Sequence, residues 1–173
     1  MNQHTLEITL IASVFVLTAL GLRALKRAQL SRSEKTQKAL TGLLGGFILM
    51  AGTVKFFDPF TTMYTTQIAL SQLPFPTLTR WLGQAVEVGA GLMLLLTLVR
   101  GASLAKLWSD GLFVLGNLMI LGAMSVALYV HWHPDVPATV LPMQSKPPVM
   151  TLVVMALVAW NLSLHRRNRL RAR

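Results

Sequence analysis

Cysteine is absent from this chain of 173 residues, and acidic residues are few, with 6 Asp and Glu against 16 Lys and Arg. Without cysteine the chain cannot form a disulfide, a thiolate metal site, a cysteine-ligated iron–sulfur centre or a covalent haem link of its own. Any redox role would need a partner, a quinone-like molecule or a metal held by histidine. Hydrolytic chemistry is also disfavoured, because only Glu87 among the acids lies well inside an apolar run.

Charge is scarce altogether, at 13% of residues, whereas a soluble domain carries about 25%. Hydrophobic residues make up 53% of the chain and occur in runs too long for strands. This composition predicts an all-α, polytopic membrane protein in contact with the lipid bilayer. The net charge of +10 does not indicate nucleic-acid binding, because the basic residues form short clusters beside the apolar runs and do not cover one folded face.

Five apolar runs predict membrane spans, at residues 8–22, 39–54, 79–99, 111–130 and 149–164. The first run is short, and we expect helix to continue through Thr5 and Leu25. Its positive charge follows it, which predicts a retained span and not a signal peptide. Between the second and third runs, residues 60–73 predict a short interfacial or partly re-entrant helix, with Asp58 as its N-cap and Pro59 as its first residue.

The basic residues predict the orientation of these spans. All Lys and Arg except Lys55, Arg80 and Lys146 lie at residues 23–38, at residues 100–106 or after residue 165. The positive-inside rule then places the C-terminus in the cytoplasm and the N-terminus outside, in a cytoplasmic (inner) membrane. The chain accordingly divides into a first span with a basic linker (1–38), a four-helix membrane core (39–165) and a basic tail (166–173).

Lys55 ends the second run on the same helical face as Gly42, Gly45 and Gly52. Such a face lets another helix approach closely, and the ammonium group then needs a partner within the contact. An ionised group in the bilayer costs at least about 2.5–3.5 kcal/mol, so it is usually paired or faces a cavity. Glu87 in the third run is the expected partner, at a similar depth.

Two interpretations stay open from the sequence. The first is structural, either an ion pair or a Lys55 side chain that snorkels outward, and the second is a polar pocket that binds a ligand headgroup or relays a proton. The residues predicted to bind such a ligand are Lys55, Glu87, Gln84 and Asn117, and no catalytic residue is predicted. For Asn117, as for Asn161, helix–helix adhesion is the competing interpretation.

A second candidate site follows the fourth run, where His131, His133 and Asp135 alternate in a proline-rich segment that we expect to be extended. Alternate side chains of an extended segment share a face, so these three would converge on zinc, copper or iron. Histidines beside Trp132 are also typical of a membrane interface, and this favours a quieter role, as a cover over the mouth of the Lys55–Glu87 cavity.

Two segments, Gly45-Gly46…Ala51-Gly52…Lys55 and Gly83-Gln84-Ala85-Val86-Glu87, together resemble the DoxX-like membrane proteins. The loop with His133-Pro134-Asp135-Val136-Pro137 and Lys146-Pro147-Pro148 is similar to one branch of that family. The resemblance covers roughly residues 40–164 and implies a four-helix bundle of the second to fifth runs, with the first run as an extra N-terminal transmembrane helix. Family members are associated with membrane redox systems, including a subunit of thiosulfate:quinone oxidoreductase.

Three functions are compatible with these observations. The resemblance implies an accessory subunit with a redox-complex protein partner, which holds a quinone-like or other amphipathic small molecule at the Lys–Glu site. A transporter for a small solute is disfavoured, because broken helices and duplicated halves are not visible. The third is a structural assembly partner whose glycine face docks a helix. The sequence does not show that the protein is an enzyme.

Overall fold

The computed structural model describes residues 3–26 and 30–171. The described part contains no β-strand; its elements are α1 (Gln3–Lys26), α2 (Arg32–Val54), α3 (Phe60–Leu70), α4 (Pro76–Arg100), α5 (Lys106–Trp132), the 3-10 turns η1 (Ala138–Val140) and η2 (Pro142–Gln144), and α6 (Val149–Arg171). Of these helices, α2, α4, α5 and α6 are long and apolar enough to cross a membrane. The predicted all-α fold is therefore confirmed, and four helices are suited to a multi-pass membrane protein.

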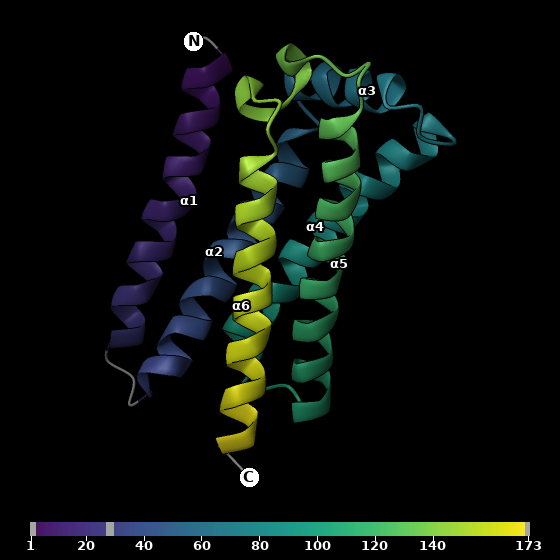
Figure 1. Cartoon of the computed structure of the whole chain (residues 1–173). Helices are drawn as coiled ribbons and strands as arrows, with labels where there is room; N and C mark the ends of the chain where they lie inside the picture. Colours follow the sequence, from purple (N-terminus) through teal and green to yellow (C-terminus); the bar gives the residue numbers. More distant parts are fainter. Residues whose placement is uncertain (1–2, 27–29, 172–173) are drawn as a thin grey trace.

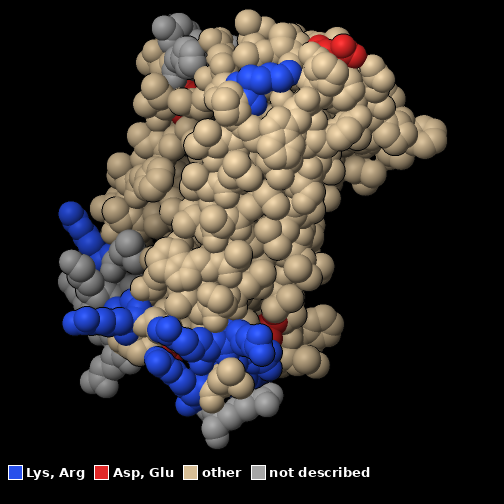
Figure 2. Space-filling model, viewed as in Figure 1, with Lys and Arg blue, Asp and Glu red and all other residues tan. Residues whose placement is uncertain are grey.

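The four long apolar helices pack in a ring, in which α2 contacts α4, α4 contacts α5, α5 contacts α6 and α6 contacts α2. Figure 1 shows α3 lying across one end of this bundle and α1 beside α2 at its edge. The two ends of the chain lie at opposite ends of the molecule. Basic side chains gather at the end where α6 terminates, and an uncharged band separates them from the other end (Figure 2).

The centre of the ring is apolar and closely packed. Leu44, Ile48, Leu94, Ile120 and Val158 are buried almost completely in one cluster. Large apolar residues on the outer faces of the same helices are instead exposed: Leu92, Leu96, Leu115, Leu118, Leu152 and Val153. Such faces suit contact with lipid chains, which are as apolar as leucine.

Glycine lets α2 and α4 approach each other closely. The predicted glycine face of α2 does face α4: Gly42, Gly45 and Gly52. From the other side, a Cβ atom placed on Gly91 would lie only 2.7 Å from the backbone nitrogen of Leu49. Real Cβ atoms keep a larger distance, so glycine at these positions is what allows the two backbones to pack together.

Two helices extend beyond the predicted spans, because polar residues continue the helix past the apolar runs. The second helix begins at Arg32 and not near residue 39, since Ser31 and Glu34 form a capping box: the Ser31 hydroxyl accepts from the Glu34 N–H and the Glu34 carboxylate accepts from the Ser31 N–H at 2.8 Å. The last helix continues through Arg171, so most of the predicted tail is helical.

The interfacial helix occurs where it was predicted, but its start is built differently. Asp58 does not cap the backbone of α3, because its carboxylate accepts a hydrogen bond from the Thr62 hydroxyl at 2.8 Å and Pro59 occupies the cap position. Phe75 then adopts a left-handed conformation (φ 49°), which redirects the chain so that α4 begins at Pro76, before the predicted start at residue 79.

The apolar stretch of α1, Thr5–Gly21, is shorter than those of the four spanning helices. A fifth span therefore stays a prediction. Its helix packs on α2, where Val14 lies beside Gly46, and the Glu7 carboxylate accepts a hydrogen bond from the Met143 N–H at 3.0 Å. Helix α1 thus contacts the rest of the structure at two places, on α2 and on η2.

We expect Gly91→Ala to destabilise the protein by roughly 1–3 kcal/mol, because the new methyl group meets the α2 backbone. Gly122→Ala is the matched control, since open space surrounds Gly122. The control should be neutral or stabilising by up to about 1 kcal/mol. Unfolding by SDS titration in mixed micelles, followed by circular dichroism, measures both. Equal stability of the two variants would contradict the close packing of α2 on α4.

Candidate functional site

Lys55 and Glu87 form an ion pair between α2 and α4. The Lys55 Nζ atom lies 2.6 Å from both carboxylate oxygens of Glu87, and the two side chains are only 18% and 10% exposed. Gly52, one turn before Lys55, makes this contact possible because a Cβ atom there would lie 2.9 Å from the Glu87 Cβ. The predicted pairing of Lys55 with Glu87 is confirmed.

Tyr64 of α3 covers the pair from the end of the bundle. Its ring centroid lies 4.1 Å from the Lys55 Nζ atom, a cation–π contact. Its hydroxyl lies against Gly83, where a methyl group would collide with it. The Thr61 hydroxyl donates to the Lys55 carbonyl at 2.9 Å and so holds α3 over the end of α2. Burial, and then the charge of Glu87, raise the pKa of Tyr64, so its hydroxyl stays protonated at neutral pH.

Sequence reasoning did not identify Tyr64 as part of the site. The available signal was Gly83, a glycine one helical turn before Glu87 that leaves room for a large side chain. Nothing in the sequence specified that α3 would provide that side chain, since the placement of α3 depends on the turn between α2 and α3.

Gln84 lies beside this cluster and differs from its other members in its hydrogen bonding. This residue is 2% exposed and lies three positions before Glu87, so both lie on the same face of α4. No residue that the structure describes hydrogen-bonds to its carboxamide. By comparison, the buried Gln67 of α3 donates to the Val140 carbonyl. The carboxamide atoms are not fully enclosed, so they keep donors and an acceptor open to a ligand group.

Asn117, the fourth residue predicted to bind a ligand, makes its hydrogen bonds elsewhere. It is fully buried, and its amide donates to the Phe113 carbonyl at 2.7 Å and accepts from Asn161 at 3.3 Å. The Asn161 oxygen in turn accepts from the Thr41 hydroxyl at 3.3 Å. These bonds connect α5, α6 and α2, as expected for helix–helix adhesion, and include none of Lys55, Gln84 and Glu87.

The structure does not bring His131, His133 and Asp135 together as metal ligands. The predicted extended backbone is wrong at its start, because α5 continues through Trp132 and its helical turn rotates His131 away from His133. Instead, His133 Nδ1 accepts from the Asp135 N–H at 3.4 Å and the Asp135 carboxylate accepts from Gln72 at 2.8 Å. Within residues 3–26 and 30–171, no group of three His, Asp or Glu side chains is placed to hold a metal.

The loop after α5 is folded against the end of the bundle and is not simply extended. The Lys146 ammonium donates to the carbonyls of His133 at 2.7 Å and Val136 at 2.6 Å, which closes the loop on itself. Val136 and Leu141 are fully buried, and η1 contacts α3. The loop therefore supports the helix that carries Tyr64.

Comparison of this chain with protein-family models, with curated proteins and with solved structures finds no match. The resemblance to DoxX-like proteins thus stays a prediction based on the quoted segments.

Breaking the ion pair should be costly. We expect Glu87→Gln to destabilise the protein by roughly 3 kcal/mol, because it leaves the Lys55 ammonium without its anion in a low-dielectric contact. Lys55→Met combined with Glu87→Gln should cost less than the sum of the two single changes. Chemical unfolding of the four proteins gives the coupling between the sites, and strictly additive effects would exclude a direct interaction.

Proposed function

We propose that the protein is a DoxX-like accessory subunit of a membrane redox system, and that it holds the polar head of a quinone-like or other amphipathic small molecule at Lys55, Tyr64, Gln84 and Glu87. The observation that carries the proposal is the Gln84 carboxamide, to which no described residue hydrogen-bonds, on the same helical face as an ion pair. The association with redox systems rests on the resemblance of residues 45–55 and 83–87 alone.

The chemistry of the cluster suits a ligand with carbonyl or hydroxyl oxygens. An ammonium group has three N–H donors, of which Lys55 uses two on the Glu87 carboxylate. The Gln84 amide adds donors and an acceptor, and the protonated Tyr64 hydroxyl adds another donor. The chain would bind and orient such a head, while electrons would travel on the ligand and on a protein partner.

The proposed topology has five spans, with the N-terminus outside and the C-terminus in the cytoplasm of an inner membrane. The basic residues at the end where α6 terminates support it through the positive-inside rule (Figure 2). The positions of the chain ends at opposite ends of the molecule agree with an odd number of passes (Figure 1). The polar cluster would then lie toward the outer surface, beneath α3.

The proposal predicts opposite effects for two buried glutamines. Gln84→Leu should reduce co-purified ligand at least about tenfold while leaving stability unchanged or higher, because the folded protein without ligand loses no hydrogen bond. Gln67→Leu should lower stability by about 1 kcal/mol, because it removes the bond to Val140, yet keep the ligand. Mass spectrometry of organic extracts from gently solubilised protein measures the ligand, and thermal unfolding measures stability.

The same extracts test the proposal against its competitors. Wild-type protein that carries no small molecule but purifies with a stoichiometric membrane partner would support the structural assembly role. Uptake of a solute into sealed vesicles would support a transporter. Equal ligand retention by wild type and by the Lys55→Met, Glu87→Gln double variant would remove the basis of the proposed site.

A further inference from the structure

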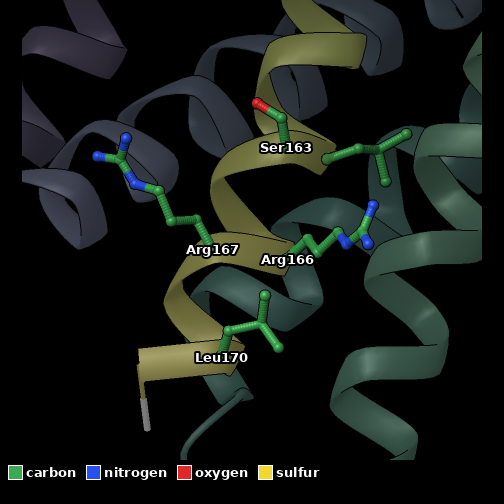
Figure 3. Close-up of a pocket in the computed structure, with 5 residues that line it drawn as sticks. Ser163, Arg166, Arg167 and Leu170 are labelled. Carbon is green, nitrogen blue, oxygen red and sulfur yellow. The ribbon is translucent and has the colours of Figure 1, made fainter.

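A second candidate surface lies at the opposite end of the molecule, on the outside of α6. It is a groove of about 400 Å³ that is lined by Leu162, Ser163, Arg166, Arg167 and Leu170. Figure 3 shows Ser163 one turn before the two arginines, whose guanidinium groups extend to either side of the helix. Leu170 lies on the helical turn that follows the two arginines (Figure 3). The groove therefore combines two cations and a hydroxyl with apolar ends.

The two arginines of the groove have no acidic partner. Among the residues that the structure describes, neither Arg166 nor Arg167 forms an ion pair, whereas Arg169 lies 3.3 Å from the Asp110 carboxylate. Guanidinium groups bind phosphate oxygens through paired N–H donors, and they are more weakly hydrated than ammonium groups. The two guanidinium groups that flank the groove are thus suited to an anionic phosphate.

The position of the groove along α6 indicates which kind of molecule would supply that phosphate. Residues 149–164 of α6 carry no charged side chain, and Leu162 and Ser163 belong to the last turn of this run. Arg166 and Arg167 follow directly. In a helix that crosses a membrane, this step from apolar to basic residues lies at the boundary between lipid chains and headgroups. A soluble anion would gain nothing from the apolar end of the groove.

We propose that this groove binds an anionic phospholipid, with an acyl chain along Leu162 and the headgroup beside the Arg166 and Arg167 guanidinium groups that flank it. Basic pockets on transmembrane helices at the cytoplasmic surface recognise lipid headgroups in this way. The site is independent of the ligand proposed at Lys55, because it lies at the other end of the bundle.

A neighbouring groove provides an internal comparison. It has a similar volume of about 420 Å³, and its lining residues are Lys106, Leu107, Asp110, Gly111, Val114 and Arg169. There the carboxylate of Asp110 faces Arg169 and neutralises part of the basic charge. This second groove should therefore contribute little to the preference for an anionic lipid.

The test is native mass spectrometry of the full chain in detergent with added phosphatidylglycerol, or phosphatidylcholine with the same acyl chains. We expect phosphatidylglycerol to bind in preference, and Arg166→Gln with Arg167→Gln to weaken that binding about 10- to 30-fold. Arg32→Gln with Lys35→Gln is the matched control, since it removes two positive charges from the same end of the molecule but none from the groove. Circular dichroism verifies that both variants are folded.

Several outcomes would overturn the proposal. Equal loss of phosphatidylglycerol in both variants would indicate general charge attraction, and equal binding of the two lipids would exclude selection of an anionic headgroup. Displacement of the lipid by millimolar inorganic phosphate would indicate a site for a free anion. Displacement by soluble polyglutamate at matched charge would indicate a docking surface for an acidic protein segment.

Discussion

The close approach of α2 and α4 is the constraint on which the rest of the structure depends. Gly52 and Gly91 remove the side chains that would hold the two helices apart, and Lys55 and Glu87 then meet at the end of the contact. Packing and charge reinforce each other here: without the glycines the charges would not reach one another, and without the ion pair the contact would leave a charge in an apolar surrounding. Helices α5 and α6 complete a ring with this pair of helices.

The molecule separates its polar groups into three levels. The Lys55–Glu87 pair lies beneath α3 at one end, and Tyr64 closes it off. An adhesion cluster joins α2, α5 and α6 through Thr41, Asn117 and Asn161. At the basic end, polar side chains of α2 and α6 bond to each other, as Gln37 does to Asn168 at 2.7 Å. The first level combines the ion pair with the Gln84 carboxamide, to which no described residue hydrogen-bonds, and this is why we place ligand binding there.

Some of this arrangement could be predicted from the sequence, because charges inside apolar runs are rare and must find each other. Lys55 and Glu87 were paired on that ground, and the glycine spacing gave the contact face. Helix ends were harder to predict. The charged residues after Ser31 were read as a linker because hydropathy marks the part of a helix that suits a membrane, whereas the capping box marks where the helix starts.

The remaining errors have the same physical origin, since they depend on tertiary contacts. The alternation of His131 and His133 suggested a shared face only because the segment was taken as extended, and α5 runs two residues into it. Tyr64 was overlooked because its position over Lys55 depends on how α3 crosses the bundle. Gln84 and Asn117 looked alike in sequence as buried polar residues, and only the structure separates the open amide from the satisfied one.

Charge reversal tests the central claim most directly, because it asks whether Lys55 and Glu87 face each other in the folded membrane protein. Lys55→Glu alone would place two carboxylates in contact, and Glu87→Lys alone two ammonium groups. The account predicts that each single reversal strongly destabilises the protein in SDS titration and that the double reversal restores most of the lost stability. A double variant no more stable than either single variant would contradict the pairing on which the proposed site depends.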